Sequence, residues 1–239
     1  DWTTFRIKTA FLESTAEVQL FIRAEGDIKL WVSGCRVSMD DTPVQPRTGF
    51  EALKDHRFDQ GSGINLDASP RVIENLEVLA KVWGFMKYYH PEVTRGKYNW
   101  DYELFRITPR IGEAACKDER NTYLSEWIDQ FGKIRKVADY TIKDPGLYSR
   151  IINLDWLYDE NLFDKKLINK LDRIKNAERD STFNYYVVPF LQTLKSYFDR
   201  EKAYPDITWE DQGYRILTLF RFWNAMEYCF PYVEMTDKK

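Results

Sequence analysis

The chain has 239 residues, with 35 basic and 38 acidic side chains and a formal net charge of −3. Lys and Arg alternate with Asp and Glu along the whole sequence, which argues against the concentrated basic face that nucleic-acid binding requires. An apolar fraction of 44% with 31% charged residues is typical of a chain that folds around a core. No window is long and apolar enough to predict a membrane-spanning helix. Because the sequence begins without Met, we expect it to be part of a longer protein.

The first 45 or so residues show the period-two alternation of β-strands. A fourth short strand is expected at residues 35–38, after three longer runs at residues 5–9, 18–22 and 28–32. Three or four strands are too few to close a sandwich. Residues 1–47 are therefore predicted to be the C-terminal strands of a β-sandwich module.

The remaining residues, 48–239, are predicted to form a mainly α-helical domain. Residues 48–67 are polar and contain three glycines, which predicts a linker or an ordered loop, and helical periodicity follows it. Ser69 and Pro70 are typical of a helix start, and apolar residues then recur at helical spacing until Pro91. Further helices are expected from near Asn99, around residues 124–131 and across residues 163–174. The aromatic stretch at 183–190 suits an extended segment. The predicted fold class is α+β, a partial β-sandwich followed by a helical domain.

The most specific feature is an internal repeat. WGFMKYYHP at residues 83–91 and WNAMEYCFP at residues 223–231 share Trp, Met, Tyr and Pro and lie 140 residues apart. This coincidence predicts two related helical units. Trp83 and Trp223 lie on the apolar sides of their helices, so we expect both to pack in the core. Asn99 and Trp100 open a helix after the first repeat, and nothing in the sequence matches that helix after the second.

The sequence offers little for catalysis. Its two histidines, His56 and His90, and three distant cysteines, Cys35, Cys116 and Cys229, form no metal-binding spacing. The cysteines are expected to be free thiols, although one disulfide remains open. Motifs for a nucleophilic serine and for nucleotide binding are missing from the sequence. We therefore predict no catalytic residue, no metal and no cofactor in this chain.

Aromatic residues are the remaining candidates for contacts with a ligand. Candidates for a binding cleft gather around the end of the first repeat: Tyr88, Tyr89, His90, Tyr98 and Trp100. Packing inside the core is the alternative for each of them.

The segment NLEVLAKVWGFMKYYHPEV at 75–93, with KYNWDYELFR at 97–106, resembles a known region. It is similar to the non-catalytic region before the peptidase domain in bacterial tail-specific (C-terminal-processing) serine peptidases. YRILTLFRFWNAMEYCFPY at 214–232 resembles the segment that leads toward the catalytic part of those proteins. The first 45 residues resemble the closing strands of a carbohydrate-binding-like module.

The resemblance implies a secreted, periplasmic or cell-envelope serine peptidase with a Ser-Lys dyad in a later domain. No position here matches that dyad. The implied role of residues 48–239 is to position the substrate or the catalytic domain. The implied partners are the chain's own downstream peptidase domain and a polypeptide substrate or glycan. A cell-surface glycan- or protein-binding module is the alternative, and a structural spacer is a third possibility.

Overall fold

A computed structural model describes residues 37–39, 42–44, 49–134, 152–180, 183–190, 195–198 and 200–230. The chain divides into two compact units, Asp1–Thr48 and Gly49–Lys239. The strands predicted between residues 5 and 32, and Cys35, lie outside the described residues.

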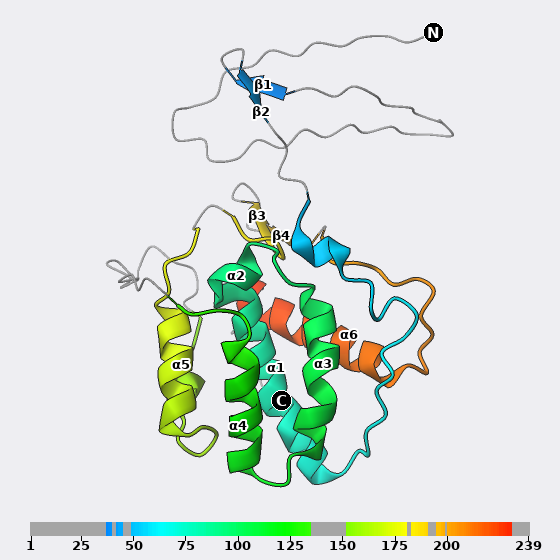
Figure 1. Cartoon of the computed structure of the whole chain (residues 1–239), viewed down its shortest axis with the longest axis vertical. Helices are drawn as coiled ribbons and strands as arrows, with labels where there is room; N and C mark the ends of the chain where they lie inside the picture. Colours follow the sequence, from blue (N-terminus) through cyan, green and yellow to red (C-terminus); the bar gives the residue numbers. More distant parts are fainter. Residues whose placement is uncertain are drawn as a thin grey trace. The chain divides into compact units, whose positions relative to one another are not determined.

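In the first unit, the described residues form one antiparallel hairpin of β1 (Val37–Met39) and β2 (Thr42–Val44) (Figure 1). The predicted fold class, α+β with a partial β-sandwich, is wrong. The described part of the chain is helical, and its strands are limited to this hairpin and a second of equal length. A sandwich needs two sheets stacked face to face. Period-two alternation predicts a strand with two different faces, but it does not show what covers either face.

The described part of the second unit is built mainly from α-helices (Figure 1), as predicted for this domain. The α-helices are α1 (Pro70–Tyr89), α2 (Pro91–Thr94), α3 (Trp100–Glu113), α4 (Lys117–Asp129), α5 (Lys165–Lys175) and α6 (Gln212–Cys229). Two 3-10 helices, η1 (Glu51–Lys54) and η3 (Asp155–Tyr158), precede α1 and α5. The second hairpin pairs β3 (Val188–Phe190) with β4 (Lys195–Tyr197).

Helix α1 begins and ends where its sequence predicts. The Ser69 hydroxyl accepts a hydrogen bond from the backbone N–H of Val72, and Pro70 occupies the first turn. His90 has extended backbone at the other end, directly before Pro91. The side chains that cap the starts of α3, α5 and α6 in the same way are Asn99, Asp164 and Asp211.

The core of the second unit lies around α1, which contacts α3, α5 and α6. Trp83 on α1 and Trp100 on α3 are both fully buried. Each indole N–H donates to the backbone carbonyl of the other tryptophan, at 3.0 Å in both directions. Trp100 also stacks on Trp127 of α4. Two buried indoles with satisfied N–H groups make this a well-defined core contact.

Both repeats form helices, α1 and α6, and the two tryptophans have different surroundings. Trp83 is in the core, as expected, whereas Trp223 is 53% exposed, so its predicted core position is wrong. Helix α6 packs on α1 through a face that contains Phe220 and Asn224. Trp223 lies on another face, which no other part of the described chain covers.

Candidate functional site

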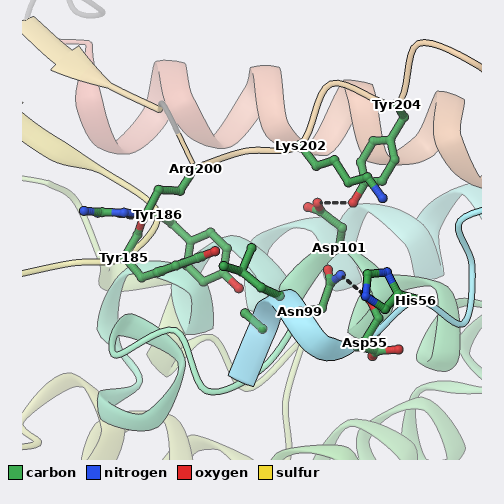
Figure 2. A pocket seen from close by; sticks show the side chains of 11 residues that line it. Asp55, His56, Asn99, Asp101, Tyr185, Tyr186, Arg200, Lys202 and Tyr204 are labelled. Atoms are coloured by element: carbon green, nitrogen blue, oxygen red, sulfur yellow. Dashed lines mark hydrogen bonds between the residues drawn. The ribbon is translucent and has the colours of Figure 1, made fainter. Parts of the chain in front are cut away.

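A pocket of about 170 Å³ lies at the start of α3. Its walls come from four parts of the chain: η1 and the residues after it, the start of α3, the segment before β3, and the segment between β4 and α6. Figure 2 shows these side chains converging from separate elements. The lining residues are Ala52, Leu53, Asp55, His56, Asn99, Asp101, Tyr185, Tyr186, Arg200, Lys202 and Tyr204.

Backbone contacts fix the tyrosine wall of the pocket. The N–H of Tyr185 donates to the carbonyl of Thr94 at 2.7 Å. The hydroxyl of Tyr186 accepts from the backbone N–H of Trp100 at 3.0 Å and donates to the carbonyl of Tyr98. Burial raises the pKa of the Tyr186 hydroxyl well above its usual value. This tyrosine is therefore a neutral structural bridge between the pocket wall and the start of α3.

Arg200 is the cation on the tyrosine side of the pocket (Figure 2). Its guanidinium carbon lies 5.5 to 5.7 Å from the ring centroids of Phe50, Phe183 and Tyr185, a cation–π environment. Among the described residues it donates a single, long hydrogen bond, 3.5 Å from Nη1 to the carbonyl of Tyr185. Within the described residues no carboxylate pairs with it, so its planar N–H donors remain available to a ligand.

Asp101 lies at the opposite side of the pocket, and its carboxylate is paired with an arginine. Arg221 of α6 donates to its two carboxylate oxygens, at 3.2 Å from Nε and 2.5 Å from Nη2. The hydroxyl of Tyr204 donates to it at 2.8 Å, as Figure 2 shows. Burial opposes the charge of Arg221, but Asp101 and Glu201 together raise its pKa.

Next to the pocket, Asp59 gathers three donors. Lys202 Nζ lies 2.6 Å from Oδ1, the hydroxyl of Tyr102 donates to the same oxygen, and His56 Nδ1 lies 2.9 Å from Oδ2. The hydrogen bonds from Lys202, then Tyr102 and His56, hold the pKa of Asp59 far below its usual value. The carboxylates of Asp101 and Asp59 are therefore both hydrogen-bonded to protein donors. Groups held in this way suit a binding site better than a site of proton transfer.

A fully buried lysine, Lys87 of α1, lies close to this network. Its ammonium pairs with Glu201 and lies 5.0 to 5.6 Å from the ring centroids of Trp83, Tyr88 and Tyr186. Burial lowers the pKa of Lys87, and Glu201 opposes that change. The pair ties the segment that carries Arg200 to the core.

A second, larger cleft of about 650 Å³ lies where α1 and α2 meet, beside the end of α4 and the segment after α5. His90 and Phe131 are among its lining residues, with charged side chains of both signs. His90 is 1% exposed, and neither ring nitrogen has a hydrogen-bond partner among the described residues. Burial lowers the pKa of His90 from 6.5 to about 4, so its imidazole is neutral at pH 7.

The five residues predicted for a cleft do not share one site. Trp100 is a core residue, and the rings of Tyr88 and Tyr89 both pack against Tyr228 of α6. Of the five, His90 lines the larger cleft, and Tyr98 supports the smaller pocket through its carbonyl.

Sequence reasoning missed the residues that do line the smaller pocket. Tyr185 and Tyr186 stand in the aromatic stretch at 183–190, which is the one signal that pointed to them. Arg200 and Lys202 belong to no recognisable motif, and only the fold places them beside α3.

Among the described residues, no cluster of His, Cys, Asp and Glu has the arrangement to hold a metal ion. Cys116 is exposed, Cys229 is half-buried, and both are free thiols. None of the helices combines the length and the apolar character needed to cross a membrane.

No protein-family model, curated protein or solved structure matches the chain.

Proposed function

We propose that the chain is the non-catalytic N-terminal region of a secreted or cell-envelope tail-specific serine peptidase, and that it positions substrate by holding a polypeptide end. The resemblance in residues 75–93, 97–106 and 214–232 motivates this proposal. These segments contribute to α1, α3 and α6. The start of α3 forms part of the pocket in Figure 2, and α6 supplies Arg221, which holds Asp101 at that pocket.

The observation that carries the proposal is the guanidinium of Arg200, which lies beside aromatic rings and pairs with no carboxylate among the described residues. A guanidinium binds a carboxylate through two parallel N–H donors, with charge assistance. The terminal carboxylate of a polypeptide has this geometry, and the tyrosine rings offer an apolar surface to its last side chain. A pocket of about 170 Å³ is smaller than sites for drug-sized ligands, which suits one terminal residue.

Such a pocket contributes to proteolysis without performing it. Binding energy from a part of the substrate remote from the scissile bond can be used to orient that bond in the active site. We expect removal of residues 1–239 from the parent peptidase to lower kcat/KM for long substrates that end in a free carboxylate. Unchanged cleavage rates and substrate choice after this deletion would contradict the positioning role.

The direct test is a titration of the full chain with paired peptides. The two peptides have the same sequence and an apolar last residue, and one ends in a carboxylate while the other ends in an amide. We expect the carboxylate peptide to bind about tenfold or more tightly, since hydrogen bonds to charged groups contribute about 1.5–3 kcal/mol. Equal affinity for the two peptides would refute the proposal.

Two variants localise the effect. Arg200→Gln should abolish the preference for the free carboxylate. Arg110→Gln is the matched control, because Arg110 lies on the exposed side of α3 in a surface ion pair with Glu126, and it should keep the preference. Loss of the preference in both variants would argue against Arg200 as the anchor.

A glycan-binding module is the second candidate, and one feature of the pocket favours it. The pocket combines an aromatic side chain, Tyr185, with the planar polar groups of Asn99 and Asp55 on its other side (Figure 2), and side chains of these two kinds contact sugar rings and their hydroxyls. Titration with oligosaccharides from envelope polysaccharides separates the two readings. A response to sugar with none to either peptide would favour the glycan-binding module.

A further inference from the structure

Helix α6 has an apolar face that no part of the described chain covers. Leu219, Phe222 and Trp223 are 62%, 65% and 53% exposed. Their spacing places them on one side of the helix. Contiguous large apolar side chains at a surface mark an interaction site more often than scattered ones do.

The internal repeat relates the exposed residues of this face to equivalent positions in α1. The counterparts in α1, 140 residues earlier, are Leu79, Val82 and Trp83, and all three are fully buried. Helix α3 lies against this part of α1, and its Trp100 makes the reciprocal indole bonds with Trp83. The same positions are therefore core in the first repeat and surface in the second.

The contact between α1 and α6 relates the two repeats spatially. A side chain at Gly84 would overlap the amide of Asn224, and the rings of Tyr88 and Tyr228 lie 5.0 Å apart. Each of these contacts joins a position to its own counterpart in the other repeat. A local two-fold relation produces such contacts between equivalent positions. Applied to α3, this relation places a second helix on the exposed face of α6.

A charge gives independent support. Arg221 of α6 binds Asp101 at the start of α3. The counterpart of Arg221 in the first repeat is Lys81, which takes part in no ion pair among the described residues. Under the two-fold relation, the partner of Lys81 is an acid at the start of the helix that covers α6, in the position of Asp101.

We propose that the face of Leu219, Phe222 and Trp223 binds one kind of partner, an amphipathic helix of the α3 pattern. This helix begins with a tryptophan followed by an acid, and its apolar residues continue at the spacing of Trp100, Leu104 and Ile107. The tryptophan stacks on Trp223, and the acid pairs with Lys81. None of the residues of this face lines the pocket of Figure 2, so the peptide titration and this proposal can fail separately.

The test uses the full chain with two extensions after Lys239. One repeats the sequence of residues 97–114, and the matched control carries Trp100→Ala, Leu104→Ala and Ile107→Ala within that repeat. The intact extension should remove most binding of a hydrophobic dye and slow hydrogen exchange in α6. The control extension should leave both unchanged. Equal behaviour of the two extensions overturns the proposal.

Two substitutions in the host chain locate the helix. Phe222→Asp, at an exposed position, should abolish the protection that the intact extension gives. Lys81→Ala should weaken that protection, and the change should disappear when the extension carries Asp101→Asn. Protection that survives Phe222→Asp would place the helix elsewhere and refute the assignment.

Sedimentation of the unextended chain tests the main competing occupant. A monomer that exposes the dye-binding face agrees with the proposal. A dimer that Phe222→Asp dissociates would mean that a second copy covers this face, and it would overturn the proposal.

Discussion

Acid should destabilise the second unit through one buried imidazole. His90 ends α1, is 1% exposed, and has no hydrogen-bond partner for either ring nitrogen among the described residues. Its ring meets Phe131 edge to face. Glu92 raises its pKa and Lys97 lowers it, but burial is the largest effect. The folded protein therefore favours the neutral imidazole.

The size and sign of the effect follow from the two pKa values. The pKa of His90 falls from 6.5 in the unfolded chain to about 4 in the folded one. As the pH falls, the unfolded chain binds the proton before the folded chain does. The contribution of the neutral His90 to the free energy of unfolding is therefore fully present above pH 6.5 and is lost as the pH falls toward 4. At about 1.4 kcal/mol for each pH unit, the full loss is about 3 kcal/mol.

Urea unfolding between pH 7.5 and pH 4, with the midpoint and slope recorded at each pH, measures this loss. His90→Phe keeps a ring against Phe131 and removes the titrating group. It should be about as stable as the native chain at pH 7, because the lost nitrogens have no partners, and should lack the steep acid decline. His56→Gln is the control, since His56 is exposed, and it should retain the decline. An unchanged pH profile in His90→Phe would refute the reasoning.

Two further predictions concern contacts that hold α1 in place. Glu201→Gln leaves the buried ammonium of Lys87 without its nearest carboxylate and should cost about 3 kcal/mol of unfolding free energy. Adding Lys87→Met should recover most of that loss. A double variant no more stable than Glu201→Gln would contradict the pairing. Gly84→Ala should cost about 2 kcal/mol, because the added methyl overlaps the amide of Asn224. Asn224→Gly should relieve that cost, as measured by urea unfolding of the single and double variants.

Asp211 caps α6 by accepting from the N–H of Tyr214 at 3.0 Å, and it also accepts from the N–H and hydroxyl of Ser62 at 2.7 and 2.5 Å. Asp211→Ala should therefore cost about 2 kcal/mol, at the upper end of capping effects. Asp164→Ala, which removes only a helix cap at α5, should cost less; equal losses in thermal unfolding would contradict the added role of the Ser62 contact.

Much of the helical architecture was predictable because its signals are local. The Ser69-Pro70 start of α1, the Asn99 cap of α3 and the apolar periodicity of α5 act within a few residues of the chain. The β-sandwich was not predictable in this way. Alternation describes a single strand, while a sandwich depends on which second sheet covers it, and the described strands form only short hairpins.

The candidate site illustrates the same limit. Tyr88, Tyr89 and Trp100 looked like cleft residues because aromatics cluster there in the sequence. In the structure they fill contacts between α1, α3, α4 and α6. Arg200 was not noticed, because a single arginine in a polar segment has no pattern. Its importance arises from three aromatic rings contributed by residues 15 to 150 positions away.

The sequence alone therefore determined where α1 begins and ends, where α3 begins, and that α1 and α6 contain a repeat, because capping, periodicity and repetition are properties of neighbouring residues. It did not show that α4 begins at Lys117, seven residues before the predicted helix. The tertiary structure alone decided which repeat is core and which is surface. Trp83 and Trp223 have the same local sequence signal, but α3 covers the first and nothing among the described residues covers the second. Burial depends on what packs against a helix, and that partner is remote in the sequence.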